Sequence, residues 1–120
     1  TAKRAEQVIV DLETNERDDL LKRLDREGIL LDLTSRLSHE RNADLRKEAV
    51  EFLSALDLSR FKQTISEALQ DQASEVRLAA IEALGQLEDP ALQQAVAALA
   101  QDPVEEVRNA VKRRKLRTVK

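Results

Sequence analysis

Apolar residues recur along this chain with the three- and four-residue spacing of α-helices, and short polar turns separate the runs. In the clearest stretch, one apolar stripe spans residues 74–87 and comprises Val76, Ala80, Ala83, Leu84 and Leu87. A second stripe spans residues 90–101 and comprises Leu92, Val96, Leu99 and Ala100. Two amphipathic helices are therefore predicted, each with one side to bury.

Turn signals mark where these helices begin. Asp89 and Pro90 stand at the start of the second helix, where an Asp side chain caps free amides and a proline needs no amide of its own. Asp102 and Pro103 repeat this signal. They predict a further helix, whose acidic first turn suits the helix dipole.

The pattern repeats every 31 residues. Glu75-Val76-Arg77 recurs as Glu106-Val107-Arg108, and Asp44-Leu45-Arg46 lies 31 residues earlier. Further matched pairs are Asp71 and Asp102, Ala79 and Ala110, Leu53 and Leu84, Leu56 and Leu87, Phe61 and Leu92, and Ile65 and Val96. Two short helices cannot bury their stripes alone, so equal units are expected to stack. The fold class predicted is all-α, an α-solenoid of about three to four antiparallel helical hairpins.

The repeat is clear from residue 43 onward and decays before it. The predicted upstream helices are 43–56 and 59–69 for the preceding unit, and 18–24, 29–37 and a short one within 1–12 for an irregular front end that aligns only with a one-residue shift. We expect residues 1–42 to form degenerate N-terminal capping helices. Residues 43–120 would form the repeats, and the whole would be a single structural domain.

The last unit departs from the pattern. Arg114 and Lys115 stand where the preceding unit has Ala83 and Leu84. Either a polar helix closes the stack here, or the chain belongs to a larger protein that continues past Lys120. An uncapped end would also permit self-association into a homo-oligomer.

The segment from Asp71 to Val111 carries an extended motif. It reads D-x-x-x-x-V-R-x-A-A-x-x-A-L-G-x-L-x-D-P-x-L, followed by D-P-x-x-x-V-R-x-A. This motif resembles the HEAT-like repeat of the phycobilisome-lyase type, and the likeness extends more loosely back to Ala43. The resemblance implies a solenoid whose second helices line a concave side that grips another protein. It also implies a scaffold or regulatory role, commonly within a larger bacterial protein.

Phycobilin lyase subunits form one branch of the resembled family, so a bilin lyase or bilin chaperone is an alternative function. The sequence disfavours this alternative because the chain is short. It also has only two aromatic residues, Phe52 and Phe61, and no Cys with which to cradle a tetrapyrrole.

Three arginines recur at the same place near a helix start: Arg46, Arg77 and Arg108. They would either bind an acidic partner or a phosphate, or each would pair with a carboxylate of a neighbouring unit, such as Asp71 or Asp102. The recurrence favours the structural ladder, because stacking needs every copy of the arginine and a binding site seldom does.

A second candidate surface is the helix 91–101, which has no charged residue in a chain that is 36% charged. If this helix faces the concave side, its exposed strip suits contact with a partner protein. The candidate partner-binding positions, including two from the preceding unit, are Lys62, Ser66, Gln93, Gln94, Ala97 and Gln101. The alternative is that the helix is buried between neighbouring units.

The C-terminal residues form a basic cluster. The last nine residues carry six basic and no acidic side chains, whereas the rest of the chain holds 14 basic and 23 acidic ones. The cluster comprises Lys112, Arg113, Arg114, Lys115 and Arg117. Docking to nucleic acid or an anionic membrane is a second alternative function. A solvated capping helix is favoured instead, because no aromatic residue is interleaved for base stacking.

Catalytic and metal-binding patterns are missing from the sequence. His39 is the only histidine and is placed in a turn, and there is no Cys and no glycine-rich phosphate loop. No apolar run is long enough to cross a bilayer. We therefore expect a non-enzymatic, cytoplasmic protein of bacterial type that binds another protein and uses no cofactor or metal.

Overall fold

The computed structural model describes residues 14–118, with the backbone alone at residues 14, 15, 36, 38 and 114–118. The helices in chain order are α2 (Thr14–Arg26), α3 (Ile29–His39), α4 (Ala43–Glu67), α5 (Ser74–Leu84), α6 (Pro90–Ala97) and α7 (Glu105–Thr118). Two 3-10 turns, η1 (Ala68–Gln70) and η2 (Ala98–Gln101), extend α4 and α6. The described residues contain no strand, so the all-α prediction is confirmed.

Helix α4 is two helices joined at a kink. Asp57 has extended backbone angles (φ −165°, ψ 90°), which separate residues 43–56 from the helical residues that follow. The Asp57 carboxylate accepts a hydrogen bond from the Arg60 amide at 3.2 Å, as an N-cap does. Asn42 caps the first part by accepting the amides of Asp44 and Leu45. The kink therefore produces the helical hairpin that the sequence predicted for this unit.

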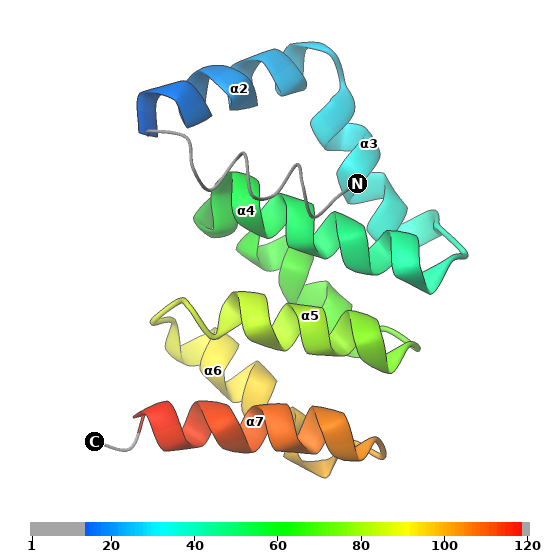
Figure 1. Ribbon diagram of the computed structural model, residues 1–120, viewed down its shortest axis with the longest axis vertical. Helices are drawn as coiled ribbons and strands as arrows, with labels where there is room; N and C mark the ends of the chain where they lie inside the picture. The colour runs from blue at the N-terminus through cyan, green and yellow to red at the C-terminus, as the bar shows by residue number, and fades with distance from the viewer. Residues whose placement is uncertain (1–13, 119–120) are drawn as a thin grey trace.

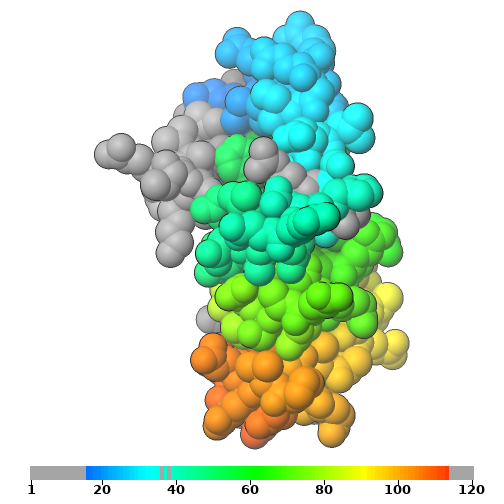
Figure 2. All heavy atoms as spheres, turned by 90° about the vertical axis from the view of Figure 1, so that its right-hand side faces the viewer, coloured from blue at the N-terminus to red at the C-terminus, as the bar shows by residue number. Residues whose placement is uncertain are grey.

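Successive units stack side by side. Figure 1 shows the first part of α4, α5 and α7 lying in one row, with α6 behind that row, and α5 packs against both α4 and α7. In Figure 2 the chain runs from the blue and cyan end to the orange end in successive layers. This arrangement is the predicted helical-repeat solenoid.

The core is continuous through the stack and repeats with the sequence. Fully buried side chains occupy equivalent positions of successive units, as Leu53 and Leu84, Val76 and Val107, and Val50 and Ile81 do. Each such apolar side chain contributes roughly 1.5–3 kcal/mol by leaving water. The largest fully buried side chains are Val50, Leu53, Leu56, Ile65, Leu69, Val76, Ile81, Leu84, Val107 and Val111.

Some helix ends differ from the prediction. Helix α5 ends at Leu84 and not at residue 87, because the next amides, of Gln86 and Leu87, bond three residues back to Ala83 and Leu84. Helix α6 likewise tightens into η2 after Ala97. Both changes are the 3-10 endings that helices commonly adopt in their last turn.

The front end forms two helices that are longer than predicted, 14–26 and 29–39. Gly28 joins them with φ +75°, a conformation that favours glycine. His39 is the last residue of α3 and not part of a turn, which corrects the sequence prediction. The helix expected within residues 1–12 lies outside the described residues.

Candidate functional site

An ion pair joins the unit that contains α5 and α6 to the unit that begins with α7. Arg77, in the first turn of α5, donates from Nη2 to Asp102 Oδ1 at 3.1 Å, and its Nε lies 2.9 Å from Oδ2 without the alignment of a hydrogen bond. The side chains of Arg77 and Asp102 are only 11% and 4% exposed. Asp102 stands just before α7 and also accepts the Val104 amide at 2.9 Å. The pair therefore ties α5 to the start of the next unit.

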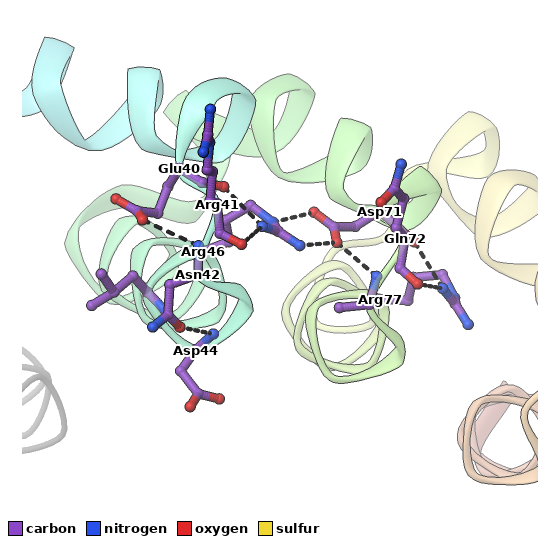
Figure 3. Close-up of polar contacts among 10 residues, drawn as sticks. Glu40, Arg41, Asn42, Asp44, Arg46, Asp71, Gln72 and Arg77 are labelled. Carbon is purple, nitrogen blue, oxygen red and sulfur yellow. Dashed lines mark hydrogen bonds and ion pairs between the residues drawn. The ribbon is translucent and has the colours of Figure 1, made fainter.

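The same arrangement occurs one unit earlier (Figure 3). Arg46 donates to the two carboxylate oxygens of Asp71 at 2.8 and 2.9 Å, and the Asp71 carboxylate accepts the Ala73 amide at 2.9 Å. A bidentate pair of this kind fixes direction as well as distance. The repeat in the sequence is thus a repeat of contacts.

We call this series of Arg–Asp pairs between successive units the ladder. Backbone carbonyl groups also bind its arginines. Each of these arginines uses Nη1 to bond carbonyl groups in the turn before its own helix: Arg46 bonds Glu40 and Arg41, and Arg77 bonds Asp71 and Gln72. Asp71 therefore accepts Arg46 through its carboxylate and Arg77 through its carbonyl oxygen. One turn residue connects two successive units in this way.

The ladder lowers the pKa values of its carboxyl groups. Burial raises the pKa of Asp71, but the hydrogen bonds from Arg46 and the Ala73 amide, with the charges of Arg46 and Arg77, bring it below its ordinary value of 3.8. Burial likewise opposes ionisation of Asp102. Its bonds from the Val104 amide and Arg77, with the charges of Arg77 and Arg108, place its pKa below the ordinary value. Both residues are therefore carboxylates at neutral pH.

Arg108 continues the ladder on one side only. Its Nη1 donates to the Asp102 carbonyl oxygen at 2.7 Å, as the Nη1 of Arg77 does to Asp71. Among the described residues, no carboxylate pairs with Arg108. The Nε and Nη2 edge that binds Asp in the two earlier units is therefore unoccupied by the described part of the chain.

The second helices expose one side to solvent. Leu92 and Val96 of α6 are buried, whereas residues on the opposite side of the helix are exposed. We call this exposed side, together with its equivalent in the preceding unit, the second-helix face. It comprises Gln63, Glu67, Gln70, Gln94, Ala97, Ala98 and Gln101. Helix α6 is thus not buried all round between its neighbours.

Three of the six predicted partner-binding positions belong to this face: Gln94, Ala97 and Gln101. Gln93 is half-buried, because its side-chain amide donates to the Leu87 carbonyl oxygen at 2.8 Å and so braces the turn before α6. Ser66 is half-buried and donates to the Gln63 carbonyl oxygen. Lys62 is exposed but lies 3.2 Å from Asp89 in an ion pair between two units. Gln93 and Ser66 are therefore less exposed than the predicted strip assumed.

The members of this face that the sequence analysis missed are Gln63, Glu67, Gln70 and Ala98. Gln63 and Gln94 are 31 residues apart, and so are Gln70 and Gln101. These two pairs of glutamines could have been predicted by applying the repeat period to polar as well as apolar positions.

The basic cluster is described only in part. Lys112 and Arg113 are exposed on α7. Arg114, Lys115 and Arg117 also belong to this helix, but their side chains lie outside the described residues. The acidic start and basic end of α7 both suit its dipole.

The described residues contain no group of three or more His, Cys, Asp or Glu side chains that could hold a metal ion. A hollow of about 440 Å³ lies between α2 and the kink of α4, and no aromatic, His or Cys side chain is among its described lining residues. No helix in the described part of the chain combines the length and apolarity needed to cross a membrane.

Comparison with known families agrees with this geometry. A family model for HEAT repeats matches residues 30–113. The chain belongs to the HEAT repeat family. HEAT repeats generally serve as protein-interaction scaffolds and are typically non-catalytic. The match does not distinguish the phycobilisome-lyase type from other HEAT repeats. Searches of curated proteins and of solved structures gave no match.

Proposed function

We propose that this HEAT repeat domain is a scaffold or regulatory module that binds another protein through its second-helix face. The observation that carries the proposal is the character of α6 with η2. Residues 91–101 have no charge in a chain that is 36% charged, yet Gln94, Ala97 and Gln101 are exposed. A helix that needed only solubility would carry charges on this side, as the other helices do.

The chemistry of this face suits a polypeptide partner. A glutamine amide both donates and accepts hydrogen bonds, and removing it from water costs less than removing a charge. The small residues Ala97 and Ala98 between Gln94 and Gln101 allow close approach. The helices are already formed and held by the core, so little ordering entropy is lost on binding.

The face also extends across two units. Gln63 and Gln70 repeat the spacing of Gln94 and Gln101. A partner can therefore contact two glutamine side chains in each of two successive units. The part of the face in the preceding unit also carries the charged residue Glu67, which would orient the partner along the stack.

Two other functions make different predictions. A bilin lyase or bilin chaperone would change the absorbance spectrum of an added bilin. A nucleic-acid or membrane docking module would bind DNA or anionic vesicles through Lys112 and Arg113 with strong salt dependence. Within this proposal we expect neither result, and α2 and α3 are assigned the role of capping the repeats.

The proposal is tested by adding charge to the face without changing side-chain size. Gln94→Glu with Gln101→Glu places two negative charges on it. The matched control is Gln72→Glu with Gln86→Glu, which adds the same charges at exposed turn positions that are not part of the second-helix face. Each protein is immobilised, exposed to an extract of the cells that make it, and the retained proteins are quantified by mass spectrometry.

We expect a partner that the unaltered protein and the control retain equally and that the Gln94/Gln101 variant loses by at least tenfold. Circular dichroism melts should coincide for all three proteins. Equal retention of every partner by the two variants would refute a role for this face.

A further inference from the structure

Helix α7 also has an exposed side, and this side is not part of the second-helix face. Helix α5 packs against α7, and three of its residues, Arg77, Leu78 and Ile81, are each more buried than the equivalent residue of α7. The equivalents in α7 are Arg108, Asn109 and Lys112. We call these three residues the open face of α7. Arg77 and Ile81 are buried, whereas Asn109 and Lys112 are exposed and Arg108 is half-buried.

Arg108 on this face is half of a binding site that the chain itself completes twice elsewhere. Its Nη1 is anchored by the Asp102 carbonyl oxygen at 2.7 Å, as the Nη1 of Arg77 is anchored by Asp71 at 2.7 Å. In the two earlier units, the remaining edge of the guanidinium binds an Asp carboxylate at 2.8–3.1 Å. The anchored guanidinium of Arg108 is therefore already oriented for a carboxylate.

Lys112 decides the character of the occupant. The equivalent residues Val50 and Ile81 of the two preceding units are fully buried. An apolar surface packed here would bury the ammonium group of Lys112 without a partner, which is costly. Lys112 lies one helical turn from Arg108, so an occupant with two carboxylates on neighbouring positions satisfies both cations.

We propose that the open face of α7 binds an acidic segment of another protein, with one carboxylate in the fork of Arg108 and a second beside Lys112. The first carboxylate belongs to an Asp just before a helix, because Asp71 and Asp102 occupy such turns where they meet Arg46 and Arg77. Asp71 and Asp102 are already paired with Arg46 and Arg77, so neither of them is the carboxylate that we place beside Arg108. The proposal shares with the proposed function only the idea that the domain binds proteins, and it uses another surface.

The probe is a capped peptide that copies residues 99–106, which contain Asp102, Glu105 and Glu106 in one turn. It is titrated into the ¹⁵N-labelled chain at about 0.15 M salt, where long-range charge effects are largely screened. The Nε–Hε signals of the arginine side chains and the amides of α7 are followed by NMR. We expect a saturable shift of the Arg108 signal, with those of Arg46 and Arg77 unmoved.

Variants then separate the fork from simple charge attraction. Arg108→Gln should weaken the peptide at least tenfold, as loss of a charged hydrogen-bonded pair does. Lys112→Gln should weaken it several-fold, and it is the safer variant because Lys112 is exposed. The matched control is Arg113→Gln, which removes the same charge from the neighbouring exposed residue, equivalent to Glu82 and outside the open face. Its effect should be less than twofold.

Three results would overturn the proposal. One is a peptide that causes no saturable shift at Arg108. Another is equal weakening by Lys112→Gln and Arg113→Gln, which would indicate unspecific attraction to a basic helix. The third is inorganic phosphate that competes at the same concentration as the peptide, which would make the site a general anion site. Variants of Gln94 and Gln101 leave this assay unchanged, so its failure is distinguishable from failure of the proposed function.

Discussion

Ile81 and Lys112 occupy the same position of successive units, but Ile81 is fully buried and Lys112 is exposed. Ile81 belongs to α5, which packs against α7. Lys112 replaces it on the side of α7 that the described residues leave open. This position of the repeat therefore holds a buried apolar residue in α5 and a solvent-exposed charged residue in α7.

The replacement predicts that Lys112→Ile promotes self-association. The substitution restores the stacking residue on an exposed surface, and exposed apolar surface next to a helical stack favours contact with another copy. Sedimentation velocity over a range of concentrations should show larger species than the unaltered chain does. Arg113→Ile adds the same side chain outside the open face and should associate less. Identical sedimentation of the two variants would contradict this.

Truncation of a stacking residue should be costly. Leu84 is fully buried, and Leu84→Ala is expected to lower the free energy of unfolding by roughly 2–5 kcal/mol. Urea unfolding followed by circular dichroism measures the change. Leu31 is 76% exposed, so Leu31→Ala removes the same atoms and should shift stability by no more than about 0.5 kcal/mol. Similar losses in the two variants would mean that the stack does not depend on this core.

Neutralising one member of the ladder should destabilise the stack. Asp102→Asn leaves a buried Arg77 guanidinium without a counter-charge, and we expect a loss of about 3 kcal/mol. A double-mutant cycle with Arg77→Leu in urea isolates the pair, and its coupling energy should be well above the typical surface value of about 0.5 kcal/mol. Strictly additive losses would show that the two residues act independently.

The lowered pKa values of Asp71 and Asp102 predict an acid-sensitive fold. Their folded-state pKa values lie below the ordinary 3.8, so the stabilisation is complete above that pH and is lost as pH falls through the lowered pKa values. Melting temperature should therefore fall steeply below about pH 4. Asp71→Asn should flatten this dependence. Asp44→Asn, which removes an exposed carboxylate outside the ladder, should leave its slope nearly unchanged.

The turn between α2 and α3 depends on Gly28. Its φ of +75° is strained for any residue with a side chain, although a Cβ at this position would meet no atom within 4 Å. Gly28→Ala should therefore cost about 1 kcal/mol through backbone strain alone. Thermal unfolding compared with the exposed neighbour variant Glu27→Ala measures it. No difference between the two would show that α2 and α3 contribute little to the cooperative unit.

Stacking was predictable from the sequence because the core residues recur in successive units with the same spacing. Leu53 with Leu84, and Val76 with Val107, report the period directly, and Arg46 with Arg77 reports the ladder. The apolar residues are fully buried and each arginine pairs with the Asp that precedes the next unit, so the side chain is constrained in every copy. The coarse family and the all-α fold follow from those positions alone.

The exposed face was less predictable because it depends on helix phase. Gln93 and Gln94 are both polar and adjacent, and only the bond from Gln93 to the Leu87 carbonyl oxygen turns Gln93 inward. Tightening of α6 into η2 after Ala97 advances each residue by about 120° and not 100°, which rotates Gln101 relative to a regular helix. Such small rotations decide exposure and are absent from a simple apolar pattern.

The most direct test of the stacked repeat measures the distance between equivalent positions of successive units. Asp44, Glu75 and Glu106 are exposed at equivalent positions, and the sequence has no Cys, so spin labels can be placed on them through introduced cysteines. Neighbouring packed helices lie 8–10 Å apart, so electron paramagnetic resonance should give about that separation for the pair at 44 and 75 and about 16–20 Å for the pair at 44 and 106. A 44–106 distance equal to or shorter than the 44–75 distance would mean a closed bundle and would contradict the stacked repeat.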